Sequence, residues 1–308
     1  MALASSAPAQ VLPSWNDGPA RSQVVAFVTR VTTEGSSDFV PVRDRIAVFD
    51  NDGTLWAEQP MYFQFLFALD RVQSLAPQHP EWKGKPPFGP LLAGDMKAYL
   101  AQGEKAVLAA MAQSHAGMTT DAFQAEVKAW LANARHPKTG LPYTKMAYAP
   151  MIELLDYLRA NGFTTYIVSG GGVEFIRCFA ESTYGIPPEQ VIGSQGKLEY
   201  RAPSLVKLSE VQFIDDGPGK PAGIQAGIGR RPLAAFGNSD GDREMLEWTT
   251  AGDGPRFALL VHHTDEAREY AYDRASAVGK LDKALDQARA KGWTIVDMKK
   301  DWKKVYAD

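Results

Sequence analysis

The sequence predicts an α/β protein whose core is a doubly wound parallel sheet. From about residue 146 onward, short apolar runs that suit buried strands alternate with helical patterns, the order that builds a parallel sheet covered on both faces. An earlier apolar run, 46–49, stops abruptly at a polar turn that contains a glycine. Between these parts, residues 58–145 carry helical patterns and no convincing strand, so we expect an inserted helical unit there.

Length and composition are those of an ordinary globular protein. The chain has 308 residues, a length that is enough for two compact units. Of these residues 45% are hydrophobic and 22% are charged, and the net charge is -3. The lack of basic excess argues against a nucleic-acid partner, and no apolar stretch reaches the ~18 residues of a membrane span. The single cysteine, Cys178, excludes an intrachain disulfide and fits a small core residue. The sequence does not specify an oligomeric state.

The first 20 residues contain several proline and glycine residues, and they predict a flexible leader over residues 1–20. The small residues at 2–9 resemble the cleavage end of a secretion signal, although no basic or long apolar region accompanies them. We therefore expect a periplasmic or secreted protein. A cytoplasmic protein with a disordered leader is the alternative.

The core is expected to comprise residues 21–57 and 146–308, interrupted by the insertion at 58–145. Apolar spacing predicts helices at 21–33 before the first strand and at 62–75, 91–100, 105–114 and 120–134 within the insertion. After it, we expect helices at 151–160, 173–183, 221–228, 242–248, 281–290 and 299–305, and strands at 163–168, 191–192, 211–214, 233–236, 257–261 and 293–296, with a hairpin-like region after residue 192.

Two carboxylates stand at the end of the strand predicted at 46–49. Asp50 and Asp52 are followed by Gly53, which lets the chain turn sharply so that the two side chains diverge. One carboxylate can then attack phosphorus while the other handles a proton. Taken alone, the stretch is equally compatible with a polar surface turn, because Asp, Asn and Gly favour turns.

The order Asp-x-Asp-Gly-Thr-Leu after an apolar strand resembles the first motif of the haloacid dehalogenase (HAD) superfamily, whose members are mostly phosphohydrolases. Farther along, a predicted strand ends in Ser169-Gly170-Gly171-Gly172 and a helix follows. A hydroxyl and bare backbone N–H groups at such a place suit a phosphate. This run is similar to the second motif of the superfamily, in the form found in the phosphoserine phosphatase-like branch.

The third and fourth motifs of the superfamily also have counterparts. Lys220, at a predicted helix start 18 residues before Asn238, fits the third-motif lysine, and Lys207 is the alternative. The fourth motif places acidic oxygens after a strand, where they suit Mg²⁺. The family usually has aspartate where this chain has Asn238, while Asp242 matches the later aspartate and Asp240 is an additional carboxylate. The sequence leaves open which of these three contacts the metal.

The resemblance implies a HAD-like Rossmannoid core that carries a Mg²⁺-dependent phosphomonoester hydrolase acting on a small phosphorylated metabolite through an aspartyl-phosphate. It assigns catalysis to Asp50, Asp52 and Lys220, the phosphate to Thr54, Ser169, Gly170 and Gly171, and the metal to Asp50, Asp52, Asn238 and Asp242. Two alternatives stay open: a phosphomutase or other phosphotransferase with the same intermediate, and a non-catalytic phosphate-ligand binding protein. Only the Asn238 departure favours the second.

The insertion at 58–145 lies where the family places its mobile cap. Glu58 stands just beyond the catalytic turn, and a buried unpaired carboxylate is costly. We therefore expect Glu58 to contact a cation on the substrate or a group on the cap. The resemblance to phosphoserine phosphatases, in which a glutamate just beyond the first motif binds the amine of the substrate, favours the former. The pair His262 and His263 follows a predicted strand, and no role is assigned to it.

Overall fold

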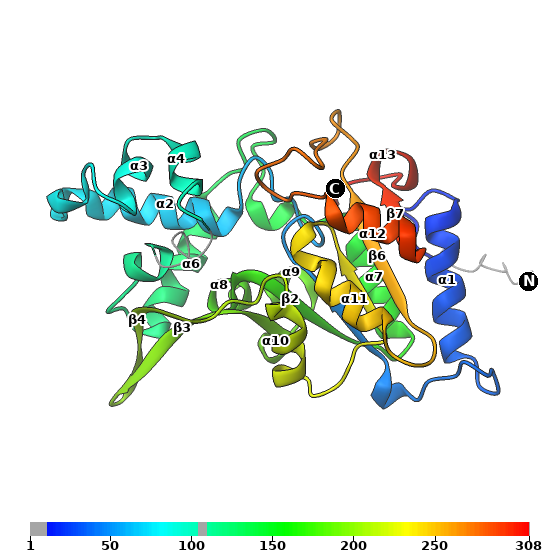
Figure 1. Cartoon of the computed structure of the whole chain (residues 1–308). Coiled ribbons are helices and arrows are strands. Elements are labelled where there is room, and N and C mark those ends of the chain that lie inside the picture. Colours follow the sequence, from blue (N-terminus) through cyan, green and yellow to red (C-terminus); the bar gives the residue numbers. More distant parts are fainter. Residues whose placement is uncertain (1–10, 104–109, 308) are drawn as a thin grey trace, which may run out of the picture.

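A computed structural model describes residues 11–103 and 110–307, and a seven-stranded sheet forms its centre (Figure 1). The order across the sheet is β4-β3-β2-β1-β5-β6-β7. The strands are β1 (Ile46–Phe49), β2 (Thr164–Gly172), β3 (Val191–Arg201), β4 (Ser204–Phe213), β5 (Ala234–Gly237), β6 (Phe257–His262) and β7 (Thr294–Asp297). All neighbouring pairs are parallel except β3 and β4, so the predicted α/β fold with a parallel core is confirmed.

The antiparallel edge differs from the prediction. The short strands expected at 191–192 and 211–214 are the two ends of one long hairpin made by β3 and β4. Only Ala202 and Pro203 separate these strands. A two-residue connection reverses the chain and pairs its strands antiparallel, whereas a parallel pair needs a crossover of a dozen or more residues.

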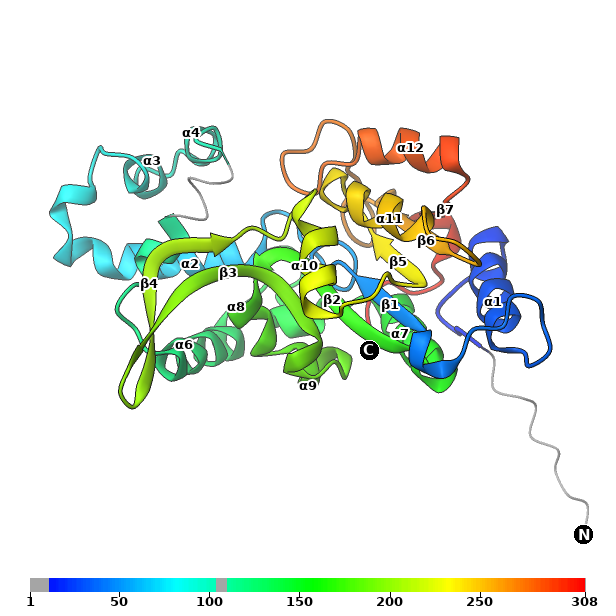
Figure 2. The ribbon, with the colours of Figure 1, turned by 60° about the horizontal axis from the view of Figure 1, so that its bottom comes forward.

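Helices cover both faces of the parallel part of the sheet (Figure 2). One face carries α1 (Pro19–Thr32), α7 (Ala149–Ala160), α8 (Val173–Arg177) and α9 (Ala180–Tyr184), and the other carries α10 (Gly219–Gly227), α11 (Arg243–Thr250) and α12 (Lys283–Lys291). Along β1, Ala47 and Phe49 pack into the first layer, while Ile46 and Val48 pack into the second. Burial on both faces explains why this strand is an unbroken apolar run.

The chain between β1 and β2 forms the inserted helices α2 (Phe63–Leu75), α3 (Phe88–Leu92), α4 (Met96–Leu100) and α6 (Thr120–Asn133). Figures 1 and 2 show α2, α3 and α4 projecting beyond the end of the sheet that is opposite α1. The helix predicted at 91–100 is broken because Gly94 has a left-handed φ of 75° and the Asp95 side chain caps a new helix. Of the helix predicted at 105–114, residues 105–109 lie outside the described residues.

The remaining elements are short. They are α13 (Met298–Asp301) and the 3₁₀ turns η1 (Val42–Asp44), η2 (Ala76–Gln78), η3 (Pro80–Trp82), η4 (Tyr143–Lys145), η5 (Pro188–Gln190) and η6 (Asp240–Asp242). The helix predicted at 173–183 is divided into α8 and α9. The division falls at Phe179, whose non-helical backbone lets its ring stack on Trp56 at 4.3 Å. Between these helices Cys178 is half-buried, and burial raises the pKa of its thiol to about 11.

The prediction of a flexible leader is wrong for residues 11–20. Trp15 is fully buried, its indole N–H donates to the Pro150 carbonyl at 2.9 Å, and its ring lies 6.3 Å from that of Trp302. Burial of a large aromatic ring outweighs the local preference of proline and glycine for loops. Residues 1–10, which carry the resemblance to a secretion signal, lie outside the described residues. In the described part of the chain, no helix is both long and apolar enough to cross a membrane.

Candidate active site

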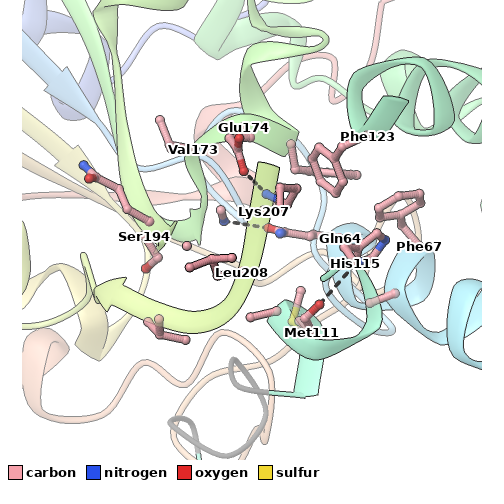
Figure 3. A pocket seen from close by; sticks show the side chains of 17 residues that line it. Gln64, Phe67, Met111, His115, Phe123, Val173, Glu174, Ser194, Lys207 and Leu208 are labelled. Carbon is pink, nitrogen blue, oxygen red and sulfur yellow. Dashed lines mark hydrogen bonds and ion pairs between the residues drawn. The ribbon is translucent and has the colours of Figure 1, made fainter. Parts of the chain in front are cut away.

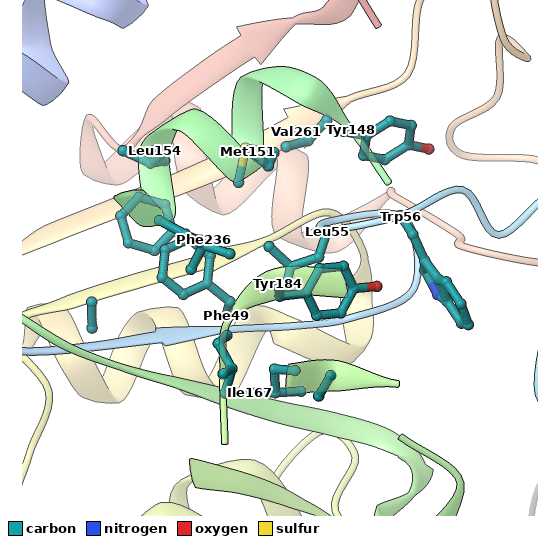
Figure 4. Packing of buried hydrophobic residues seen from close by; sticks show 14 of the residues in the cluster. Phe49, Leu55, Trp56, Tyr148, Met151, Leu154, Ile167, Tyr184, Phe236 and Val261 are labelled. Atoms are coloured by element: carbon teal, nitrogen blue, oxygen red, sulfur yellow. The ribbon is translucent and has the colours of Figure 1, made fainter. Parts of the chain in front are cut away.

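The chain turns back tightly at the end of β1, and this turn carries the first pair of carboxylates. The Asp50 N–H donates to the Phe236 carbonyl at 2.9 Å, which joins the turn to β5. Gly53 has a φ of 73°, a conformation that other residues rarely adopt. Beyond it, Leu55 and Trp56 are fully buried: Leu55 lies beside Phe236 and Tyr184 (Figure 4), and the Trp56 ring packs on Phe63 and Phe179. Packing therefore fixes the turn on both sides of the carboxylates.

Asp50 lies in a buried ion-pair cluster at the ends of β1 and β2. The Lys220 ammonium donates to Asp50 Oδ1 at 2.7 Å, to Asp242 Oδ1 at 2.6 Å and to the Val168 carbonyl at 3.0 Å. Lys220 is 1% exposed and Asp242 is 0% exposed. Burial alone would lower the pKa of Lys220, but Asp242 and Asp50 outweigh it and the pKa is raised. Lys220 is therefore a fixed cation at the predicted nucleophile.

Asp52 diverges from Asp50, as the turn predicts. Its Oδ1 atom accepts a hydrogen bond from the Trp56 indole N–H at 2.8 Å, and the residue is half-buried. Burial raises the pKa of Asp52, although the Trp56 hydrogen bond opposes the rise. A carboxyl group with a raised pKa beside the nucleophile is suited to proton transfer.

The glycine run lies beside this cluster, but no helix begins at its first glycine. Strand β2 continues through Gly172, and α8 starts only at Val173. The buried Ser169 hydroxyl accepts a hydrogen bond from the Gly171 N–H at 3.1 Å, and the Gly172 N–H donates to Gln64 Oε1 at 2.7 Å. Gln64, on α2, therefore joins the inserted helices to the predicted phosphate site.

Thr54 and Glu58 occupy positions that differ from the predicted ones. The one hydroxyl proton of Thr54 is directed to Asn238 Oδ1 at 3.0 Å rather than into the cluster around Lys220. The Glu58 side chain accepts hydrogen bonds from Asn238 and Tyr272 and is almost fully buried. Its contacts thus lie inside the catalytic layer and not on the inserted helices, because the chain after the turn runs through the core before it reaches α2.

The three residues of the fourth motif that the sequence leaves open have different contacts. Both carboxylate oxygens of Asp242 are occupied, Oδ1 by Lys220 and Oδ2 by the backbone N–H groups of Asn238 and Ser239 at 2.9 Å each. Asp240 Oδ1 accepts from the backbone N–H groups of residues 282 and 284 at the start of α12. The predicted metal contact of Asp242 is therefore not supported, and Asn238 is the side chain of the three that faces the catalytic turn.

The donor set around the turn suits Mg²⁺, which the family resemblance implies. Two carboxylates, Asp50 and Asp242, share the single ammonium of Lys220, with Asp52 close by, so negative charge exceeds positive charge. Burial and Asp242 raise the pKa of Asp50 well above its usual value, which a bound cation would counteract. No cage of three or more His, Cys, Asp or Glu side chains occurs in the described residues. A site made from one carboxylate, one backbone carbonyl and one amide oxygen needs no such cage.

Several residues of the site have no counterpart in the sequence predictions. His263 Nε2 donates to the Gly53 carbonyl at 2.8 Å, and the Tyr184 hydroxyl donates to Asn51 Oδ1 at 3.1 Å, so both hold the turn. The adjacent carboxylates Asp215 and Asp216 lie close to Lys220, which acts on the pKa of both. The sequence could have indicated them, because they directly follow a predicted strand that ends in apolar residues, as Asp50 does.

A cavity of about 70 Å³ lies between the inserted helices, α8 and the β3–β4 hairpin (Figure 3). Lys207, the alternative for the third motif, lines this cavity, where it pairs with Glu174 and lies 4.2 Å from the centre of the Phe123 ring. Burial lowers the pKa of Lys207 to about 8. The geometry therefore assigns the contact with Asp50 to Lys220. Gln64 and Gly172 also line the cavity, so it adjoins the glycine run.

Comparison with known proteins agrees with this geometry. The profile of the haloacid dehalogenase-like hydrolases matches residues 47–247, and the chain belongs to this family. The predicted superfamily and hydrolase class are thereby confirmed. The likeness to the phosphoserine phosphatase-like branch rests on the run Val168 to Gly172. A search of curated proteins finds no match.

Two solved structures with TM-scores above 0.5 share the fold at low identity, and a third is similar at a lower score. A protein with unknown function from Bordetella pertussis Tohama I is 16% identical, with a TM-score of 0.54 over 82% of this chain and 98% of that one. A conserved protein of unknown function from Anaerococcus prevotii DSM 20548 is 17% identical, with a TM-score of 0.54 over 92% of each chain. A phosphoserine phosphohydrolase-like protein from Francisella tularensis SCHU S4 is 19% identical, with a TM-score of 0.40 over 70% and 87%.

Proposed function

We propose that this protein is a Mg²⁺-dependent phosphomonoester hydrolase that acts on a small phosphorylated metabolite through an aspartyl-phosphate on Asp50. The observation that carries the proposal is the buried Lys220 ammonium, held 2.7 Å from Asp50 and 2.6 Å from Asp242. A fixed cation beside a carboxylate at a strand end can neutralise an incoming phosphate without reorganising. Phe49 pairs with Ile167 at the ends of β1 and β2, so Asp52 and Ser169 follow the strands at the edge of the sheet where Asp50 stands.

In the first step, an Asp50 carboxylate oxygen forms a bond to phosphorus as the bond from phosphorus to the ester oxygen breaks. Asp52 gives its proton to that ester oxygen, so the leaving group departs as a neutral alcohol. In the second step Asp52 takes a proton from a water molecule whose oxygen attacks phosphorus. The bond between phosphorus and Asp50 breaks, which releases inorganic phosphate and restores the carboxylate.

The chain supplies the remaining interactions from three elements. The Lys220 ammonium places its positive charge beside the phosphoryl group, and the Ser169 hydroxyl donates to a phosphoryl oxygen. The Asp50 carboxylate, the Asp52 backbone carbonyl and the Asn238 amide oxygen would hold Mg²⁺. When bound, the metal supplies positive charge that offsets the charge of the phosphoryl group. The Trp56 indole orients Asp52 through its 2.8 Å hydrogen bond.

The helices between β1 and β2 serve, in this proposal, as the cap that covers the site. What supports this role is the hydrogen bond from Gly172 on β2 to Gln64 on α2 at 2.7 Å. The adjoining cavity, lined by Gln64 and Lys207 (Figure 3), would take the part of the substrate beyond the phosphate. Closure over this region would exclude water from the aspartyl-phosphate until the alcohol has left.

Phosphate release from p-nitrophenyl phosphate tests the proposal. Wild-type protein should release phosphate with Mg²⁺, lose turnover in excess EDTA and regain it when Mg²⁺ is restored. Mass spectrometry after an acid quench should find a phosphoryl group on the peptide that contains Asp50. Asp253→Asn, which changes an exposed carboxylate in a distant turn, is the control. Turnover that is unaffected by EDTA, or a phosphoryl group on another residue, would reject the mechanism.

A further inference from the structure

Glu58 and Asn238 form a buried hydrogen-bonded pair, and the catalytic steps assign no role to Glu58 or to the contact between the two side chains. The Asn238 Nδ2 group donates to Glu58 Oε1 at 2.7 Å, and the Tyr272 hydroxyl donates to the same oxygen at 2.8 Å. Glu58 and Asn238 are each 1% exposed. Because water does not reach them, each polar atom of the pair depends on its protein partner.

This contact decides which way the Asn238 amide faces. An amide has a donating NH₂ end and an accepting oxygen end, whereas Oε1 of Glu58 serves here as an acceptor. The NH₂ end therefore faces Glu58, and the oxygen end accepts from Thr54 Oγ1 at 3.0 Å. The amide oxygen thus faces Thr54, whereas the NH₂ group lies between Gly53 and Glu58.

The Glu58 carboxyl group has no room to turn away from Asn238. A Cβ atom on either Gly53 or Gly279 would overlap Glu58 Oε1. The two glycines have φ values of 73° and 64°, in the left-handed region. Two backbone segments that are far apart in the sequence thus form a narrow slot around the oxygen that Asn238 contacts. An aspartate at position 238 would place a second carboxyl group against that slot, where like charge opposes ionisation of both groups.

We propose that Glu58 is a positioning residue that requires asparagine at position 238 and excludes the aspartate that the family usually has there. Asn238 is then part of a matched pair, and its presence does not mark a lost catalytic function. The catalytic consequence of the pairing rests on the proposed phosphatase function, whereas the pairing itself does not. The pairing predicts that Asn238→Asp harms the protein although it restores the usual residue of the family.

The test compares wild type, Asn238→Asp, Glu58→Gln and the double variant, as full chains without added metal. Asn238→Asp should lower the midpoint of thermal unfolding by about 4–8 °C, because it opposes two buried acceptors. Glu58→Gln alone should have a small effect, because its side-chain oxygen still accepts from Asn238 and Tyr272. The double variant Asn238→Asp/Glu58→Gln should recover most of the loss, because the NH₂ group then stands on residue 58.

A second readout is the hydrolysis of p-nitrophenyl phosphate with Mg²⁺. Asn238→Asp should lower kcat/KM at least about 10-fold, and the double variant should regain at least about 10-fold over it. Tyr272→Phe is the matched control, because it removes the other donor to Glu58 without supplying an NH₂ group. Asn238→Asp/Tyr272→Phe should therefore show no rescue in either assay.

The proposal is overturned if Asn238→Asp unfolds at the wild-type midpoint, or if Glu58→Gln fails to restore it. Should Asn238→Asp not fold at all, a folded double variant supports the pairing. An unfolded double variant together with a folded Glu58→Gln refutes it. Rescue of the unfolding midpoint in a protein without phosphatase activity would reject the proposed function and keep the pairing. Phosphatase activity without rescue of the unfolding midpoint would reject the pairing and keep the proposed function.

Discussion

Replacing Asp215 by asparagine should make the stability of the protein less dependent on pH. Asp215 is 0% exposed, and neither of its carboxylate oxygens has a hydrogen-bond partner among the described residues. A Cβ atom on Gly223 of α10 would overlap Asp215 Oδ1, so helix packing covers the carboxyl group. Burial raises the pKa of Asp215 from its ordinary value of 3.8 to about 7, although Lys220 opposes the rise.

The sign follows from the proton balance. Between pH 4 and pH 7 the folded state keeps the Asp215 proton that the unfolded state has released, so stability falls as pH rises through this range. With folded and unfolded pKa values of about 7 and 3.8, the loss is complete above pH 7 and amounts to about 4 kcal/mol. Of this loss of stability, about 2.5 kcal/mol falls between pH 5 and pH 8. The asparagine side chain in Asp215→Asn keeps the shape of the aspartate and carries no titrating proton.

Urea unfolding of wild type and Asp215→Asn at pH 5, 6, 7 and 8, without metal, measures this effect. The free energy of unfolding of the variant minus that of wild type should rise by about 2.5 kcal/mol from pH 5 to pH 8. The cost of burying the new amide does not depend on pH, so it changes the difference between variant and wild type by the same amount at every pH. Asp253→Asn, at an exposed carboxylate, should give a flat difference. A flat difference for Asp215→Asn as well would show that Asp215 titrates at an ordinary pH in the folded protein.

Four further substitutions test the catalytic cluster. Asp50→Asn should abolish phosphate release while the circular dichroism spectrum stays unchanged, and phosphate release near the wild-type level would contradict the assignment of the nucleophile. Asp52→Asn should still form the phospho-enzyme from p-nitrophenyl phosphate, because the leaving group of this substrate needs no proton. Lys220→Met should lower the free energy of unfolding by about 3–5 kcal/mol at pH 7, because it leaves Asp50 and Asp242 buried without a cation, and urea unfolding measures this. Trp56→Phe should move the limb of the kcat/KM profile governed by Asp52 to higher pH, because the indole N–H holds the pKa of Asp52 down; an unchanged profile would remove Asp52 from the proton transfer.

The elements that the sequence predicts well are those whose signal is local. The run 46–49 is apolar at every position because both faces of β1 are covered, and this shows in four consecutive residues. Lys220 stands at the start of a helix where a proline follows it, and the structure places that helix at Gly219–Gly227. The hairpin of β3 and β4 was predicted only in part. The outer part of β3 is exposed, and only Val206 and Lys207 are buried on β4, so this part of the hairpin lacks the apolar run that marks a buried strand.

Motifs in the chain are enough to predict the class of the fold, the two carboxylates at the end of β1, and the lysine and serine that accompany them. The contacts that hold these groups in place become visible only in three dimensions. His263 reaches Gly53 across 210 residues and Tyr272 reaches Glu58 across 214 residues. Both carboxylate oxygens of Asp242 accept from Lys220 or from backbone N–H groups. The side chain of Asn238, and not that of Asp242, therefore faces the catalytic turn. Such contacts leave no periodic pattern in the chain, because a hydrogen bond between distant residues is fixed by how the layers pack and not by the residues beside either partner.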